Sequence, residues 1–326
     1  MAGSAFLNVK DILLFKLETA YGVDAAPSEA NSGNVIKLAE PFQIDVTQEF
    51  VEQNGGDGTR GFTTPIGTVR PAGVTFRSYI TGLNSTVVDT YTAAKKPPLA
   101  DVMRACGMFE TFTGSFYEYA PSASVDSDVS ATIVMNLDGL DTRLKGCRGN
   151  CNIIASAAGP AIAEFTFRGQ LTTEAQTIRG AATVHNVVPP RWIDSGSIIV
   201  DSYQVCVENF NLNTNNTLFE ERCSHASSGS GIGRVLITDR QPGGSLDPDI
   251  SNTSTLDILG KWRSSSAAIL NLHFGLNSGN RFHITASNAI YKSVGYGDKS
   301  GLAIFNVDYQ AYKLGDGNNE WLIKFD

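Results

Sequence analysis

The sequence predicts a mainly β protein of two similar halves, each a β-sandwich or barrel with one short flanking helix and one long hairpin loop. The first observation is a stretch that occurs twice without a gap, at 161–171 and 303–313. Its odd positions are apolar or small and its even positions are mostly polar, which is the two-residue period of a half-buried strand. The second observation is composition, because runs of Thr, Val, Ile, Phe and Tyr between 32 Gly and 12 Pro favour strands and turns.

The third observation is that further segments recur in the same order in both halves. The first half has a strand region at 35–46, a Pro-containing turn at 70–76, a short helix at 97–106 and a strand at 131–137. The second half has matching segments at 198–207, 241–247, 254–263 and 267–273. Two all-β segments can align in this way by chance, but the common order favours duplication. We therefore predict domains at 1–178 and 179–326.

The remaining segments complete this plan in chain order. An apolar run at 11–18 reads as a strand or a docking arm, and an alternating strand at 42–51 follows a polar loop. Further strands are predicted at 116–120, 151–155, 164–171 and 320–325, with a connection without periodicity at 172–194. A Gly-rich excursion fills 52–67, and 223–233 is its equivalent in the second half. Long loops without a core are usually functional or disordered, and recurrence at the same place favours function.

Charge and cysteine content limit the class of protein. The chain has 326 residues, a net charge of −8 and no cluster of Lys or Arg, so it is a poor nucleic-acid binder. Nucleic acid could still pass along it without being bound tightly. Five cysteines without framework spacing indicate reduced thiols in a cytosolic product. We recognise no signal peptide and no apolar run long enough to span a bilayer.

A search for chemistry finds no catalytic constellation. The Gly-rich run at 229–233 lacks the Lys-Ser/Thr of a phosphate loop, and no Ser–His–Asp or Cys–His arrangement accompanies a nucleophile elbow. The weaker candidates are ordinary thiols, a histidine pair facing across a hairpin, and carboxylates in turns: Cys147 and Cys151, His273 and His283, Asp126 and Asp128, and Asp247 and Asp249. We predict no enzymatic activity, no cofactor and no metal site.

The stretch from Leu14 to Pro27 carries a resemblance to a known family. It contains Lys16-Leu-Glu-Thr-Ala-Tyr-Gly-Val-Asp24 followed by Pro27. This run resembles the opening of the tail tube proteins (major tail proteins) of long-tailed bacteriophages, in which Lys-x-Glu-Thr-x-Tyr-Gly-x-Asp and a following Pro precede the first strand. The predicted architecture is similar to that family over the whole chain, as a tandem of two tail-tube-like domains. The run has no counterpart in the second half.

The resemblance implies a structural virion protein of the tail, made in the cytoplasm of the bacterial host. It implies homo-oligomeric rings stacked into a tube, with trimers preferred because two domains per chain give pseudo-sixfold symmetry, and hexamers as the alternative. Three chains would carry 3 × (−8) = −24. The implied partners are further copies, the tape measure protein and other tail proteins. DNA would pass through the lumen without specific binding, and no membrane is involved.

Two other classes compete with this interpretation. A two-domain β-sandwich adhesin or carbohydrate-binding module would present a row of Trp or Tyr on one sheet, whereas Trp192, Trp262 and Trp321 are dispersed. A hydrolase is the third alternative, and the lack of a catalytic set counts against it.

The resemblance and the alternating pattern together nominate two sets of site residues. Contacts between subunits or rings are expected at Phe62, Pro65, Ile66, Leu14 and Phe15. A polar strand face in each half is expected to line the lumen, since unpaired Lys or Arg would bind phosphate and slow passage. The lumen candidates are Gln43, Asp45, Thr47, Glu49, Gln204, Glu208 and Asn209.

Overall fold

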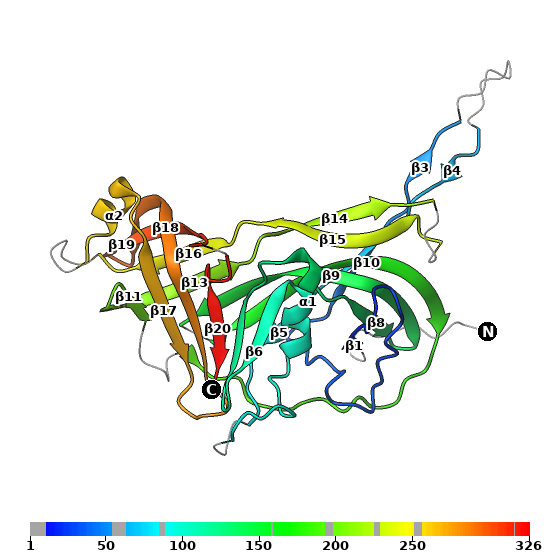
Figure 1. Ribbon diagram of the computed structural model, residues 1–326, viewed down its shortest axis with the longest axis horizontal. Helices are drawn as coiled ribbons and strands as arrows, with labels where there is room; N and C mark the ends of the chain where they lie inside the picture. The colour runs from blue at the N-terminus through cyan, green and yellow to red at the C-terminus, as the bar shows by residue number, and fades with distance from the viewer. Residues whose placement is uncertain are drawn as a thin grey trace.

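The fold is mainly β, with one short helix in each half, as the sequence predicts. The computed structural model describes residues 11–53, 63–84, 89–157, 159–192, 198–224, 229–250, 256–315 and 317–326. Figure 1 shows long antiparallel strands with helices α1 (Ala100–Ala105) and α2 (Ile258–Ser264) beside them. The Asp257 side chain caps α2 by accepting a hydrogen bond from the Gly260 amide. Among the described residues, no helix is long and apolar enough to cross a membrane.

The strands of the first half follow the predicted order. They are β1 (Ile12–Leu17), β2 (Gln43–Val46), β3 (Phe50–Val51), β4 (Ile66–Gly67), β5 (Pro71–Tyr79), β6 (Met108–Phe112), β7 (Tyr117–Pro121), β8 (Ala131–Leu137), β9 (Leu140–Ser156) and β10 (Ile162–Gln176). A two-residue turn joins β8 to β9, with positive φ at both Asp138 and Gly139. Such turns match the twist of a hairpin and favour Asp-Gly.

The strands of the second half repeat most of these elements. They are β11 (Ile198–Val200), β12 (Tyr203–Val205), β13 (Val207–Asn213), β14 (Asn216–Arg222), β15 (Ile232–Arg240), β16 (Gly243–Pro248), β17 (Ala268–Phe274), β18 (Phe282–Lys299), β19 (Leu302–Ala311) and β20 (Leu322–Phe325). The β18–β19 turn again has two residues of positive φ, Ser300 and Gly301.

One antiparallel sheet runs through both halves. Hydrogen-bonded neighbours follow the order β12-β11-β17-β18-β19-β16-β13-β9-β10-β5-β2. We call the segment from β18 to β2 in this order the wall. The halves join inside the wall, where β13 pairs with β9. They join again at β20, which pairs with both β18 and β7.

The strand order is the same in the two halves. The first half runs β1-β8-β9-β10-β5-β2 and the second runs β11-β17-β18-β19-β16-β13. The repeated strands therefore occupy equivalent places as β10 and β19. Their odd residues are buried at 163–171 and at 305–311, including Phe165 and Val307, whereas Ala303 at the head of the second copy is exposed. This supports duplication. The sheet matches β2 with β13, however, whereas the sequence alone pairs 42–46 with 203–207.

The main hydrophobic core spans both halves. Phe15 and Phe76 both pack on Phe167 behind the first part of the wall, with ring centroids 5.4–6.0 Å apart. Across the halves, the ring of Tyr119 lies 5.8 Å from that of Phe325. Core residues extend from Leu13 to Phe325, so this cluster continues across the predicted boundary near residue 179.

Candidate functional site

One face of the wall is mostly polar, with apolar side chains such as Leu302 near its β18–β19 end, while the other face packs on the core. On β10, Phe165 and Phe167 point into the core and Glu164, Thr166 and Arg168 alternate with them. The same alternation places polar residues on this face from the other strands: Gln43, Asp45, Thr75, Arg77, Asn150, Asn152, Asn209, Asn211, Asn213, Ser245, Asp247, Asn306, Asp308, Gln310 and Ser293. We call this surface the polar face.

Neutral side chains cross-link neighbouring strands on the polar face. Asn211 donates to Asn152 over 2.6 Å and Asn150 donates to Asn213 over 2.8 Å, both across the junction between the halves. Thr75 and Thr166 meet at 3.4 Å across β5 and β10. Ile154 is an apolar exception, exposed between the amides. Amide and hydroxyl groups dominate this part of the wall, and they offer no net charge to a passing ligand.

Three basic residues of the polar face are paired with carboxylates, whereas the exposed Lys292 of β18 lines a hollow with Asn211 and Asn213 and has no carboxylate partner among the described residues. Arg77 Nε lies 2.6 Å from Glu164 Oε2, and Arg168 Nη1 lies 2.6 Å from Asp45 Oδ2. Lys299 at the end of β18 pairs with Glu208. The hydrogen bond that Arg77 donates to Glu164 raises the pKa of Arg77. Exposed pairs of this kind add little stability, so their main consequence here is that Arg77, Arg168 and Lys299 are neutralised.

The structure divides the predicted lumen residues into three groups. Gln43, Asp45 and Asn209 lie on the polar face, and Glu208 lies beside it through its pair with Lys299. Thr47 and Glu49 follow the end of β2, where Glu49 pairs with Arg222 of β14. Gln204 lies on β12, next to β11 and outside the wall.

The sequence analysis missed most of the asparagines on the polar face. Asn209-Phe-Asn-Leu-Asn213 alternates polar and apolar residues, and that pattern could have identified β13 as a second wall strand. In β9 the signal was weaker, because Gly149 and the buried Arg148 interrupt the alternation next to Asn150 and Asn152.

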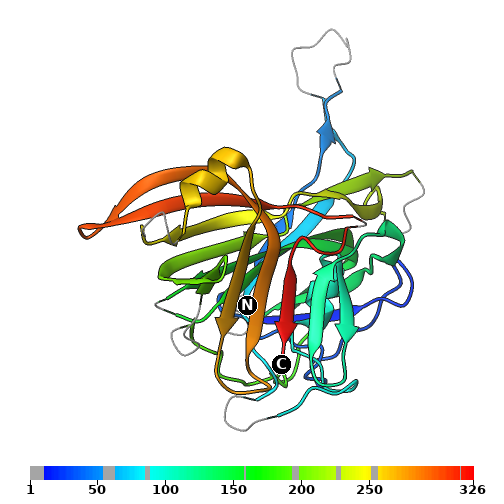
Figure 2. The same cartoon turned by 60° about the vertical axis from the view of Figure 1, so that its left-hand side comes forward.

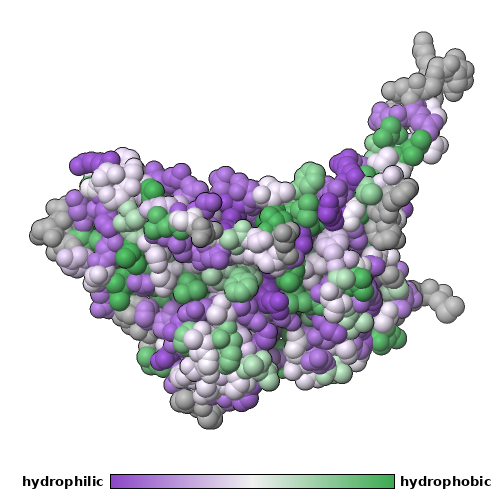
Figure 3. Space-filling model, in the orientation of Figure 1, coloured by the Kyte–Doolittle hydropathy of each residue, from purple (hydrophilic) through white to green (hydrophobic). Residues whose placement is uncertain are grey.

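A hairpin of β3 and β4 projects from the body of the molecule (Figure 1). Its described residues carry exposed apolar side chains, with Phe50 59% and Ile66 50% exposed, and Val51 also exposed. Figure 3 shows apolar surface along this projection. Pro65 is exposed as well, whereas Phe62 lies outside the described residues. Exposed apolar side chains on a projecting hairpin are typical of a surface that contacts another protein.

The other two predicted contact residues lie in the core. Leu14 and Phe15 are fully buried because β1 pairs with β8, opposite Val134 and Ile133. The apolar run at 11–18 is therefore a core strand of this chain, and these two side chains are not available to a neighbouring subunit.

The second hairpin, β14–β15, lies against the first half. The Tyr21 hydroxyl accepts the Val235 amide at 2.6 Å, and Arg148 donates to the Val235 carbonyl at 3.2 Å. Burial raises the pKa of Tyr21 to about 12, so this hydroxyl stays protonated at neutral pH. Tyr21 belongs to the Lys16–Asp24 run, so this run helps to position a hairpin from the other half.

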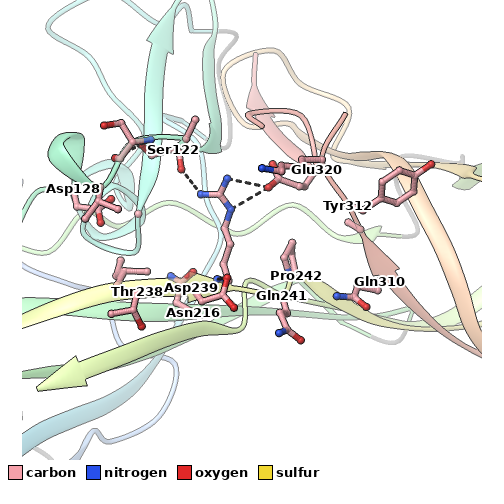
Figure 4. Close-up of a pocket in the computed structure, with 18 residues that line it drawn as sticks. Ser122, Asp128, Asn216, Thr238, Asp239, Gln241, Pro242, Gln310, Tyr312 and Glu320 are labelled. Atoms are coloured by element: carbon pink, nitrogen blue, oxygen red, sulfur yellow. Dashed lines mark hydrogen bonds and ion pairs between the residues drawn. The ribbon is translucent and has the colours of Figure 1, made fainter. Parts of the chain in front are cut away.

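A cavity of about 370 Å³ lies where the halves and this hairpin meet. Ser122 and Glu320, both labelled in Figure 4, line this cavity, and Arg240 bonds to both of them. Its guanidinium lies 2.9–3.1 Å from Glu320 Oε1 and also donates to the Ser122 and Gly317 carbonyls. These bonds connect three separate segments of the chain. We therefore interpret the residues around the cavity as a structural contact that holds these segments together.

The remaining candidate residues from the sequence are the histidine pair and the carboxylates in turns. His273 and His283 lie opposite each other on β17 and β18, with rings 4.3 Å apart, as the sequence predicts. Asp247 accepts the amides of Glu208 and Asn209. In the described part of the chain, no group of three His, Cys, Asp or Glu residues is placed to hold a metal ion.

The tryptophans do not form the exposed row that a carbohydrate-binding module would need. Trp192 and Trp321 are buried, and Trp262 lies alone on α2. The described cysteines form no disulfide, and burial raises the thiol pKa of both Cys147 and Cys151.

Comparison with known proteins agrees with the architecture. A search of curated proteins found no match. The model of one protein family, described as phage tail tube protein, matches residues 10–311, which is nearly the whole chain. The match runs from the β1 region through both halves of the wall, and the chain belongs to the phage tail tube protein family.

Proposed function

We propose that three copies of this chain close into a ring, that rings stack into the tail tube, and that the polar face lines the lumen through which DNA passes. Family membership implies a structural protein of the virion tail that self-assembles and associates with other tail proteins. The tape measure protein, a ring of three rather than six chains, and synthesis in the host cytoplasm belong to the proposal.

The observation that carries the proposal is the chemistry of the polar face. DNA has a dense row of phosphates, and each contact with an unpaired Lys or Arg adds affinity. Arg77, Arg168 and Lys299 are each held by a carboxylate. The rest of the face is largely amide and hydroxyl. Such a surface is wettable and does not retain a polyanion.

The equivalence of the two halves supports the ring of three. Each half contributes four neighbouring wall strands in the same order. Three chains would place six such units around one axis, with the polar face toward the axis and the core behind it. The projecting β3–β4 hairpin would then be free to contact the next ring.

Removing one carboxylate from the polar face tests the lumen assignment. Asp45→Asn would release Arg168 and so add one unpaired cation per chain to the face. We expect rings and tubes to form normally, and DNA ejection from phage assembled with the variant to slow down. The effect should be larger at low salt, where screening is weakest.

A matched control is Glu221→Gln, which releases Arg234 from an exposed ion pair on the β14–β15 hairpin, whose strands are not part of the wall. This variant should leave ejection unchanged. If both variants behave like the parent at low salt, or if both slow ejection equally, the polar face does not line the DNA path.

A further inference from the structure

The two halves of the wall can be aligned residue by residue through the strand ladders. In the first half, Phe167 pairs with Val74, and Val74 pairs with Ile44. In the second half, Tyr309 pairs with Gly244, and Gly244 pairs with Leu212. Because 167 and 309 are equivalent in the gapless repeat, Ile44 of β2 is the counterpart of Leu212 of β13. The flanking residues agree, since Phe42-Gln-Ile-Asp corresponds to Phe210-Asn-Leu-Asn.

The same ladders align the other ends of the two halves. Ala163 of β10 pairs with Ile153 of β9, and Phe305 of β19 pairs with Tyr296 of β18. Positions 163 and 305 are equivalent in the repeat, so Tyr296 is the counterpart of Ile153. The C-terminal part of β18 therefore corresponds to the C-terminal part of β9.

Inside the chain, these two counterparts meet. The C-terminal part of β9 pairs with β13, and Leu212 lies directly opposite Ile153. Both side chains are buried in the core, and so is the adjacent cross-strand pair of Phe210 and Ala155. This junction joins the first half to the second.

The equivalent edges at the two ends of the wall have no strand partner among the described residues. β2 pairs with β5 only. β18 pairs with β17 only as far as Ala289, and beyond that point its described pairing is with β19. Figure 2 shows the β18–β19 hairpin projecting from the body. Tyr296 is 72% exposed there, whereas its counterpart Ile153 is buried.

We propose that β2 of a second copy adds to the free edge of β18, antiparallel and in the register of the β13–β9 junction. Ile44 of the added strand would lie opposite Tyr296, as Leu212 lies opposite Ile153. Edge pairing supplies main-chain hydrogen bonds to two open strands. It would also cover Tyr296 and Val294 on the core side and continue the polar face across the boundary with Gln43 and Asp45. This inference rests on the proposed ring and specifies its closing contact.

Paired cysteines test the register. In the full-length chain, Cys206 and Cys223, which are exposed, would first be changed to Ser. Ile44→Cys and Tyr296→Cys would then be combined. Directly opposite residues in an antiparallel pair have Cβ atoms about 5 Å apart, within reach of oxidation or a short bis-maleimide. Within one chain the two positions lie at opposite ends of the wall, so a cross-link must join two copies.

We expect covalent dimers and trimers on denaturing gels from the I44C/Y296C chain. Mixing single-variant chains should give dimers only. The control Q43C/Y296C should give little product, because residue 43 faces the other side of the sheet. Stronger cross-linking of Q43C/Y296C than of I44C/Y296C would show that the proposed register is wrong. If electron microscopy shows rings but I44C/Y296C does not cross-link, this contact is wrong while the tube function stands. If there are neither rings nor cross-links, both fail.

Discussion

Asp326 shows how a single side chain holds the end of β20 against β18. It lies after β20, where Arg281 Nε approaches its Oδ1 to 2.6 Å and His283 Nε2 approaches the same oxygen to 3.0 Å. Burial alone would raise the pKa of this carboxyl group. The hydrogen bonds and charges of His283 and Arg281 outweigh burial and lower it to about 2.

This lowered pKa predicts a pH-dependent contribution to stability. A carboxylate whose pKa falls on folding stabilises the native state above its unfolded pKa, near 4, and the gain disappears as pH falls toward 2. Asp326→Asn should therefore lower the free energy of unfolding at pH 7 by roughly 1.5–3 kcal/mol, the usual worth of hydrogen bonds to a charged group. Denaturant titrations of the parent and the variant at pH 7, 4 and 2.5 measure this difference in the free energy of unfolding. A difference that stays constant down to pH 2.5 would contradict the lowered pKa of Asp326.

The two hairpins occupy equivalent places in the repeat but have different surroundings. β14–β15 lies on the first half through Tyr21, Arg148 and Gln170. β3–β4 projects with Phe50 and Ile66 exposed. The contrast supports the proposal that β3–β4 contacts a neighbouring subunit in the assembled tube.

Polar substitution of the projecting hairpin tests this interpretation. Phe50→Ser with Ile66→Ser should leave a folded protein, because neither side chain is in the core, and should abolish stacking into tubes. Circular dichroism and electron microscopy provide the two measurements. Phe219→Ser and Ile269→Ser, at exposed positions on β14 and β17, form the control and should stack normally. Normal tubes from the hairpin variant would exclude its role in assembly.

The sequence predicts elements well wherever period and turn chemistry agree. The strand at 131–137 has the predicted bounds because an apolar run ends at Asp138-Gly139. Helix α1 lies within its predicted segment, and α2 extends one residue beyond its own, to Ser264. β9 is longer than predicted, since Gly146 and Gly149 break its alternation where it bends from β8 toward the wall.

Equivalence between the halves was harder to predict for the edge strands. Tyr203-Gln-Val resembles Phe42-Gln-Ile locally, but β12 pairs with β11 while β13 takes the place of β2. Which strand fills that place depends on hydrogen bonding to β16, a long-range pairing that local patterns do not encode. The same limit applies to Leu14 and Phe15, whose burial depends on β8.

In the proposed tube, the edges of the wall decide how copies join. The wall carries a mostly polar face, on which Arg77 and Arg168 are paired, and a core-packed face. Its two outer edges have no strand partner among the described residues and match its internal junction. If copies join at those edges, the polar face becomes a continuous inner surface.

Cryo-electron microscopy of the assembled protein tests this claim most directly. We predict stacked rings of three chains with six similar units around a channel, in which Asn152, Thr166 and Asn211 face the channel. Density that places these residues on the outer surface, or assemblies without a central channel, would contradict the account.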